Sequence, residues 1–360
     1  MSGDLYYPIY LTVVGLFTYY NCMYYWQTSC YTLENRNVTF SISSFFLALT
    51  VSVLIGLRPK ASCFIDMNNY IALFEIIEQR PFQFDYDTEN IFFDNFFSWI
   101  AASGFHWSVF FLIIALIYFM GMWICSRKLF PHDTLIAFLA CLGAFSTFSY
   151  GTNGVKAGAA ASLFLIALAN HANGKKAILF LLLSLSFHHS MVLPIVAFAL
   201  AWYYRNTRAY FYIWIFSLLC AILHISFFQI LFAGFTDERG AEYLMSSGES
   251  WGGKSGFRID FVIYSIMPVL VGYWALFKKF VESRTYEFIL SVYLITNSVW
   301  MLCMYANFTN RIAYLSWFMY PIVLIYPFLE KSMGDNRYKM LALAVFLHVM
   351  FTIMMQVVYY

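Results

Sequence analysis

The sequence predicts an all-α fold, a polytopic membrane helix bundle of about 12 transmembrane helices (range 10–13) with partly re-entrant exported loops. The chain of 360 residues is 62% hydrophobic and only 11% charged, whereas soluble domains have roughly 45–50% apolar and about 25% charged residues. Its apolar residues form blocks of about 17–22, and about 20 such residues cross a hydrocarbon core. These observations exclude a soluble enzyme. Because no polar gap is long enough to fold alone, we expect a single integral-membrane domain over residues 1–360.

Twelve apolar segments are expected to form the membrane helices. In chain order they are residues 5–25, 39–57, 106–126, 134–152, 154–170, 177–188, 190–204, 210–230, 260–277, 286–305, 310–328 and 339–358. The first segment has no basic leader and no small-residue cleavage site, so we expect it to be a retained span.

The distribution of charge predicts which ends of these helices face the cytoplasm. Six short gaps and their helix edges hold thirteen of the 21 basic residues but only six acids, and the rest of the chain holds eight basic and thirteen acidic residues. By the positive-inside rule the first group is cytoplasmic. These gaps are 26–38, 127–133, 171–176, 205–209, 278–285 and 329–338. Both termini are then exported.

The segment 177–204 does not fit a simple helix count. It has 28 continuous residues, about 42 Å as one helix, which is too long for one span and short for two. His188-His189-Ser190 and Pro194 supply a polar break in its middle. We therefore predict a tight hairpin or a broken helix pair, which membrane proteins tolerate where it lines a cavity or a binding site.

Two exported loops are long. The loop 58–105 is polar but rich in aromatic residues, which is typical of a segment that is partly re-entrant or lies on the membrane surface. The loop 231–259 contains a Gly-rich stretch and is expected to be a mobile flap.

Eight basic residues are exported against the positive-inside bias. They are Arg58, Lys60, Arg80, Lys156, Arg239, Lys254, Arg258 and Arg311. Arg58, Lys156 and Arg311 lie at helix edges, where ionisable groups usually face the bundle interior and pair. Since the arginine fork suits bidentate phosphate binding, we expect an anionic lipid head group as their target. The alternative is that each residue snorkels to its own interface or pairs with a local acid.

Adjacent histidines, His188 and His189, are the next candidates. A histidine near its ordinary pKa can take a proton from a sugar hydroxyl or stabilise a leaving oxygen. Adjacent histidines point to different helix faces, so they do not indicate a metal site. The alternative role is to cap a helix break.

An acidic run, Asp85-Tyr86-Asp87-Thr88-Glu89-Asn90, contains an Asp-x-Asp pair of the kind that binds a metal diphosphate. As a calcium loop the run fails, because Asn90 stands where Gly is needed and Phe96 where Glu is needed. We favour a solvated acidic loop, and no metal is indicated. The small-xxx-small pattern at Gly154 and Gly158 predicts close helix packing that holds Lys156 rigidly.

Four short elements, in this order, resemble those of EpsG-like proteins, the Wzy-type O-antigen and exopolysaccharide polymerases. They are Leu57-Arg58-Pro59 with Asp66 and Tyr70, Asn153-Gly154-Val155-Lys156 with Ala160, Phe187-His188-His189-Ser190 with Pro194, and Asn310-Arg311 with Tyr314. The chain departs from that pattern where Lys156 replaces the usual Arg, Ala157 the usual Gln, and Ile65 a frequent Gly. Lysine keeps the charge but loses the bidentate geometry.

The resemblance implies a multi-pass glycosyltransferase of the bacterial cytoplasmic (inner) membrane. Such an enzyme joins oligosaccharide repeat units carried on polyprenyl (undecaprenyl) diphosphate, at the periplasmic or outer face, into O-antigen, capsule or exopolysaccharide. The implied partners are this lipid-linked substrate, membrane lipid and a chain-length regulator protein, with no cofactor and no nucleic acid.

The resemblance also implies roles for residues. Arg58, Lys156 and Arg311 are expected to neutralise the diphosphate, with Asn153, Tyr70 and Arg258 as further contacts to the diphosphate or the glycan. His188 or His189 is expected to deprotonate the acceptor or orient the diphosphate, and the sequence does not rank them. Asp66 is the alternative base, or the residue that fixes an arginine.

Two other functions remain open. A lipid-phosphate-linked glycosyltransferase that adds one sugar would use Asp85 and Asp87 with a divalent metal. A transporter or flippase for a lipid-linked glycan is compatible with twelve spans and the break at 188–194, although we find no paired-half symmetry. A membrane acyltransferase lacks a convincing His/Asp pair.

Overall fold

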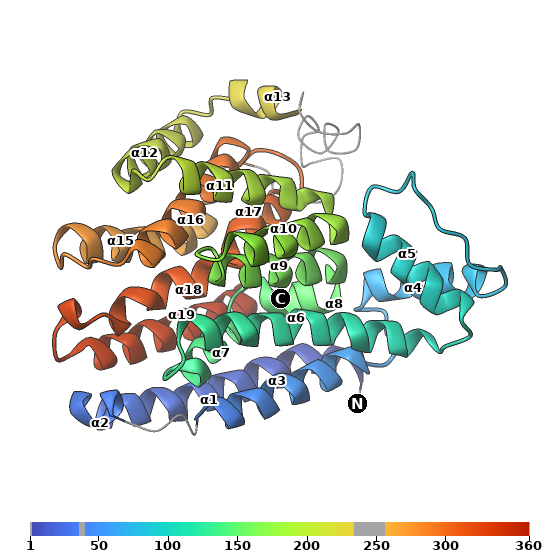
Figure 1. Cartoon of the computed structure of the whole chain (residues 1–360), viewed down its shortest axis with the longest axis horizontal. Helices are drawn as coiled ribbons and strands as arrows, with labels where there is room; N and C mark the ends of the chain where they lie inside the picture. The colour runs from blue at the N-terminus through green and yellow to red at the C-terminus, as the bar shows by residue number, and fades with distance from the viewer. Residues whose placement is uncertain (1, 36–39, 234–255, 360) are drawn as a thin grey trace. The chain divides into compact units, whose positions relative to one another are not determined.

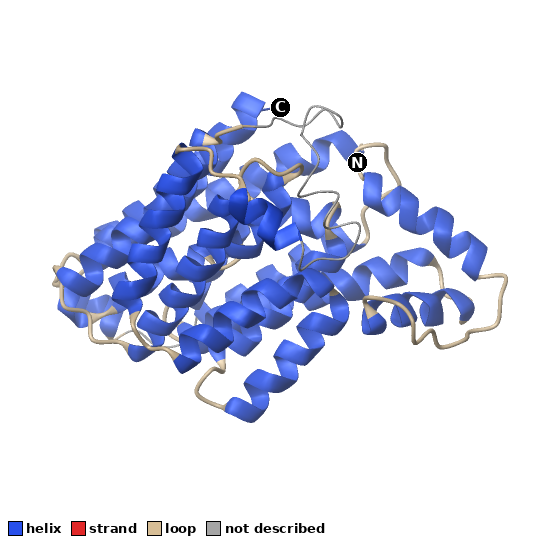
Figure 2. Cartoon of the chain, turned by 90° about the horizontal axis from the view of Figure 1, so that it is seen from above, coloured by secondary structure: helices blue, strands red, loops and turns tan. Residues whose placement is uncertain are grey.

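The computed structural model describes residues 2–35, 40–233 and 256–359, which pack as two compact units. Unit 1 comprises Met1–Val192 and Gly334–Tyr360, and unit 2 comprises Leu193–Met333. Every regular element in the described residues is helical, with no strand among them (Figure 2). The all-α prediction is confirmed, whereas the single-domain expectation stays a prediction.

Unit 1 contains the N-terminal helices and the last helix of the chain (Figure 1). Its elements are η1 (Gly3–Leu5), α1 (Tyr6–Gln27), α2 (Cys30–Glu34), α3 (Phe40–Gly56), α4 (Ile65–Ile77), α5 (Ile91–Ala102), α6 (Trp107–Leu129), α7 (Thr134–Leu142), α8 (Thr147–Thr152), α9 (Val155–Ala169), α10 (Gly174–Phe187), η2 (His189–Met191) and α19 (Arg337–Tyr359).

Unit 2 begins one residue into α11. Its elements are α11 (Val192–Tyr203), α12 (Thr207–Ile222), α13 (Phe227–Ala233), α15 (Ile259–Phe277), α16 (Arg284–Leu302), α17 (Thr309–Trp317), α18 (Tyr320–Ile325), η4 (Tyr326–Leu329) and η5 (Lys331–Met333).

Three described helices are long and apolar enough to cross a membrane: Trp107–Leu129, Ile259–Phe277 and Arg337–Val357. A fourth span results if Thr309–Trp317 and Tyr320–Leu329, which meet at 45°, count as one. The membrane character of the chain is thus supported, and the count of twelve spans is not confirmed. The predicted segments 134–152 and 210–230 each form two helices, α7 with α8 and α12 with α13.

The predicted break in 177–204 is confirmed. α10 ends at Phe187, and His188 has extended backbone angles (φ −154°, ψ 122°) that interrupt the helix before η2 and α11. The His188 side chain accepts a hydrogen bond from the backbone N–H of Ser190 at 3.1 Å, so it also caps the following turn.

The predicted exported loop 58–105 contains two helices, α4 and α5, which pack on each other. The ring of Tyr70 on α4 contacts Phe93 and Phe97 on α5, with centroids 5.9 and 5.6 Å away. Aromatic residues therefore build an internal core for this segment. Most of the other predicted loop, 231–259, lies outside the described residues.

In unit 1, α3, α6, α9 and α10 form a row of neighbours (Figure 1), and glycines at the start of α9 allow it to pack closely on α8. A Cβ built on Gly158 of α9 would lie 2.7 Å from the backbone oxygen of Tyr150 in α8, and one built on Gly154 would lie 3.0 Å from the Tyr150 ring. Both glycines of the predicted small-xxx-small pair thus contact the same residue. The predicted close packing is confirmed, and it places the first turn of α9 against α8.

A buried amide organises unit 2. Asn297 of α16 is fully buried, and its oxygen accepts a hydrogen bond from the Trp214 indole of α12 at 2.8 Å. Its amide nitrogen donates to Ser265 of α15 at 3.2 Å and to Ser316 of α17 at 3.0 Å. One side chain therefore joins four helices with its hydrogen-bonding capacity satisfied, which matters because an unsatisfied buried amide is costly.

We predict that Gly158→Ala destabilises the protein by about 1–3 kcal/mol, because the added Cβ meets backbone that cannot move aside. The thermal midpoint of detergent-purified protein should fall. Gly174→Ala is the matched control, since no atom lies within 4 Å of a Cβ at that position. Equal midpoints for the two variants would contradict the packing role of Gly158.

Candidate functional site

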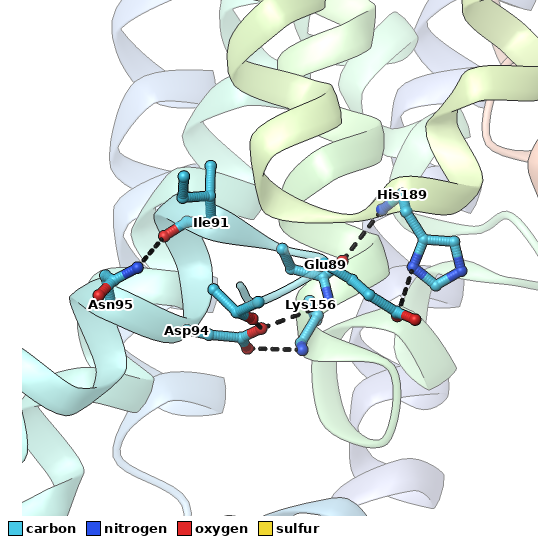
Figure 3. Close-up of polar contacts among 8 residues, drawn as sticks. Glu89, Ile91, Asp94, Asn95, Lys156 and His189 are labelled. Carbon is cyan, nitrogen blue, oxygen red and sulfur yellow. Dashed lines mark hydrogen bonds and ion pairs between the residues drawn. The ribbon is translucent and has the colours of Figure 1, made fainter. Parts of the chain in front are cut away.

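The polar residues that carry the site lie in unit 1, where α5 begins, α9 begins and α10 ends (Figure 3). Aromatic contacts fix α5 against α10, since the rings of Phe92 and Phe187 stack with centroids 5.0 Å apart. This contact brings the starts of α5 and η2 together. Segments separated by about a hundred positions in the sequence thereby share one polar network.

An ion pair links α9 to α5. The Lys156 Nζ lies 2.7 Å from Asp94 Oδ1, and the two side chains are 21% and 33% exposed. The Lys156 ammonium also lies 4.9 Å from the centroid of the Phe93 ring. Since a lysine ammonium has three N–H donors and the described contacts use one on Asp94, Lys156 keeps donors for a ligand.

The network continues from Asp94 to the helix break. The hydroxyl of Thr88 and the amide of Asn90 both donate to Asp94 Oδ2. The Asn90 oxygen in turn accepts the backbone N–H of His189 at 3.0 Å. A continuous chain of polar contacts therefore runs from Lys156 to His189, which fixes the ammonium and the histidine backbone to the same helix start.

His189 pairs with an acid. Its Nδ1 lies 3.4 Å from Glu89 Oε2, and both side chains are about half exposed (47% and 57%). A carboxylate beside Nδ1 favours a proton on that nitrogen, so the neutral ring presents its Nε2 lone pair. His189 is thus arranged as a proton acceptor.

His188 has the opposite arrangement. Because its Nδ1 accepts the Ser190 N–H, the neutral ring carries its proton on Nε2, which is therefore a donor. The two rings lie 4.9 Å apart at 30°. The break therefore places a hydrogen-bond donor and a proton acceptor side by side, a distinction the sequence did not provide.

Arg58 lies inside the protein, 1% exposed. Its guanidinium donates to the Ile55 oxygen at the end of α3 (2.8 Å) and to the Thr152 oxygen at the end of α8 (2.9 Å). Burial lowers the pKa of the Arg58 guanidinium to about 10, partly offset by Tyr6 and Asp66, so it stays charged at neutral pH. The predicted direct contact with a diphosphate stays untested, and these hydrogen bonds favour a positioning role.

Three more predicted site residues lie in the same part of unit 1 as Arg58: Asn153, Asp66 and Tyr70. The Asn153 amide donates to the Cys63 oxygen at 3.2 Å, which ties the end of α8 to the loop before α4. Burial raises the pKa of the Tyr70 hydroxyl, and the negative charges of Asp66 and Asp94 raise it further, so this hydroxyl stays protonated. The negative charge of Asp66 raises the pKa of both Arg58 and Tyr70, and the predicted roles of Asp66 stay untested.

The other two predicted site residues, Arg258 and Arg311, belong to unit 2. Arg258 pairs with Asp260 through two contacts of 3.0 and 2.7 Å, and its guanidinium lies 3.6 Å from the Phe261 ring centroid. Arg311 is exposed, with its guanidinium 4.7 Å from the ring centroid of Phe308. Their grouping with Lys156 stays a prediction.

Sequence reasoning missed four residues of the network: Thr88, Glu89, Asn90 and Asp94. The first three were assigned to a solvated acidic loop. A signal for Asp94 existed, because Asp94 and Asn95 interrupt the aromatic run from Phe92 to Phe97, and polar residues within such a run usually face a partner.

The Asp-x-Asp pair is organised by the loop itself. The Asp87 N–H donates to Asp85 Oδ1 at 2.9 Å, and the Asp85 N–H donates to Asn95 Oδ1 at 2.7 Å. Asn95 returns a hydrogen bond to the Asp85 oxygen at 2.8 Å, which holds the loop on α5. Over the described residues no three His, Cys, Asp or Glu side chains group as metal ligands.

Comparison with known proteins identifies the family. The sequence model of the EpsG family matches residues 41–360, a range that contains all four elements of the resemblance and both ends of the network. No curated protein and no solved structure matches the chain. The chain therefore belongs to the EpsG family.

Proposed function

We propose that this protein is a Wzy-type polysaccharide polymerase, a glycosyltransferase that joins oligosaccharide repeat units carried on polyprenyl diphosphate. The EpsG family is associated with polysaccharide polymerisation. The observation that carries the proposal is the network from Lys156 to His189. It links a cation at the start of α9 to the break after α10, where His188 carries a hydrogen-bond donor and His189 a proton acceptor.

The reaction needs these three groups. A hydroxyl oxygen of the acceptor sugar forms a bond to the anomeric carbon of the donor glycan, and the bond from that carbon to the diphosphate oxygen breaks through an oxocarbenium-like transition state. The hydroxyl proton passes to a base. The polyprenyl diphosphate leaves with the electron pair, so negative charge grows on it.

The cationic end of the network suits the diphosphate. Lys156 keeps N–H donors beyond the one that it gives to Asp94, and His188, next to His189 at the other end of the network, carries an Nε2–H. Preorganised donors of this kind stabilise developing charge. Arg58 would position Lys156 indirectly, because its hydrogen bonds hold the ends of α3 and α8 next to the start of α9.

His189 is the proposed base. Its Nε2 lone pair would accept the acceptor hydroxyl proton, and Glu89 beside Nδ1 would stabilise the imidazolium that forms. This arrangement ranks the two histidines, with His188 as donor and His189 as acceptor. The negative charge of Asp66 then serves to keep Arg58 charged and Tyr70 protonated.

The positive-inside assignment supports an exported location for this network. Lys156 and the 188–190 break lie at the helix ends opposite the basic gaps 127–133 and 171–176. We therefore propose an inner-membrane enzyme whose site opens to the periplasm or the exterior. A lipid-linked repeat unit would reach it from the outer leaflet.

Purified protein in lipid vesicles, supplied with a synthetic polyprenyl-diphosphate repeat unit, should produce a ladder of oligomers on a gel. The ladder follows from repeated transfer, because each product is again a donor. Addition of a single unit, or transport of substrate with no new glycosidic bond, would reject the polymerase.

We expect Lys156→Ala to reduce polymerisation by about 10²–10³-fold, the usual cost of losing one donor to developing charge. Lys156→Arg should keep most activity, because the cation and its partner Asp94 remain. Product per unit time measures both. Full activity of Lys156→Ala, with protein level in the membrane unchanged, would remove the diphosphate role.

We expect His189→Gln to slow glycosyl transfer by about 10²–10⁴-fold, the range for a general base. Glu89→Gln should slow it less, because the ring remains and only its orienting charge is lost. His106→Gln is the matched control, since His106 of the same unit contacts Ser108 outside the network. A larger loss for His188→Gln than for His189→Gln would reverse the assigned roles.

A further inference from the structure

A polar cavity lies in unit 2, where α12 begins, α15 ends and α16 begins. Its volume is about 360 Å³, within the roughly 300–1,000 Å³ of small-molecule sites. We infer that this cavity binds the head group of a phospholipid that carries both a phosphate and an ammonium group. The residues that carry the inference are Arg205, Arg208, Phe277, Phe280, Glu282 and Glu287.

The two arginines are exposed and without a carboxylate partner. Arg208 lies with its guanidinium carbon 5.2 Å from the Phe277 ring centroid, and Arg205 Nε donates to the Trp202 oxygen at 3.3 Å. Neither forms a salt bridge within the described residues, although Glu282 and Glu287 line the same cavity. Most of their N–H donors therefore face the cavity or solvent, and arginine suits bidentate phosphate binding.

The two glutamates decide between classes of lipid. An anionic head group alone would place its phosphate beside two uncompensated carboxylates, Glu282 and Glu287, and like charges in one site repel. In a head group that has an ammonium a few bonds from its phosphate, the phosphate complements the two arginines and the ammonium complements the two glutamates. The cavity thus matches a primary-ammonium phospholipid better than a purely anionic one.

One residue that lines the cavity, Phe280, has an exposed aromatic side chain on a strained backbone. Phe280 has a left-handed backbone (φ 51°), which is rare for a bulky residue and persists only where the surroundings enforce it. Here the N–H of Val281 donates to the Ala275 oxygen at 3.0 Å, which folds the chain back over the end of α15. The Phe280 side chain is left 72% exposed at the rim, where an acyl chain can cover it.

The position of the cavity favours a membrane lipid as its source. It lies at the gaps 205–209 and 278–285, which the positive-inside rule assigns to the cytoplasmic side. Helix ends on that side lie at the level of the phospholipid head groups of the inner leaflet. None of its lining residues belongs to the polymerase network of unit 1, so the inference does not depend on the proposed function.

The test is native mass spectrometry of the full-length protein, released from detergent with equal amounts of phosphatidylethanolamine and phosphatidylglycerol. Phosphatidylethanolamine should be retained preferentially. Arg205→Gln with Arg208→Gln should weaken retention of both lipids about tenfold or more, because the phosphate loses charge-assisted donors. Glu282→Gln with Glu287→Gln should abolish the preference while leaving phosphate binding in place.

The control variant Lys175→Gln with Lys176→Gln removes two exposed cations from another gap assigned to the same side, and it should bind as the unchanged protein does. Soluble glycerophosphoethanolamine tests the source of the head group and should bind far more weakly than the lipid. Equal retention of the two lipids by the unchanged protein would overturn the inference. Equally tight binding of the soluble ester would overturn the lipid assignment.

Discussion

Two hydrogen bonds from one buried cation anchor the geometry of unit 1. Arg58 joins the last carbonyl groups of α3 and α8, which would otherwise lack partners at helix ends. The next residue after α8, Asn153, donates a hydrogen bond to the Cys63 oxygen and so ties the loop before α4 to the end of α8. The direction in which α9 starts, and hence the place of Lys156, depends on this junction.

The structure uses its few charges in connected groups. In a chain with only 11% charged residues, each buried or half-buried charge needs a partner, because desolvation of an isolated charge is expensive. Lys156 forms an ion pair with Asp94, Arg258 forms one with Asp260, and Arg337 forms one with Glu34.

The family pattern acquires a physical meaning from these contacts. A lysine replaces the usual arginine at position 156, and a nearby carboxylate, Asp94, holds the shorter ammonium head in place. The neighbours of the two histidines favour different tautomers. The Ser190 N–H at Nδ1 favours a proton on Nε2 of His188, and the Glu89 carboxylate favours a proton on Nδ1 of His189. The proposed chemistry therefore depends on the backbone and acidic partners that orient the histidines, as well as on the histidines themselves.

The sequence by itself determined the all-α class, the broken segment at 188, the small-residue packing at Gly154 and Gly158, and the family. Local composition and spacing determine these features, so they can be predicted without knowing which distant residues are in contact. Only the tertiary structure decided that Arg58 is buried on carbonyl groups, that Asp94 and Asn90 link Lys156 to His189, and that α7 and α8 are separate helices. The contacts of Arg58 with Thr152, Asp94 with Lys156 and Asn90 with His189 join residues 94, 62 and 99 positions apart, whose proximity arises only when the helices pack.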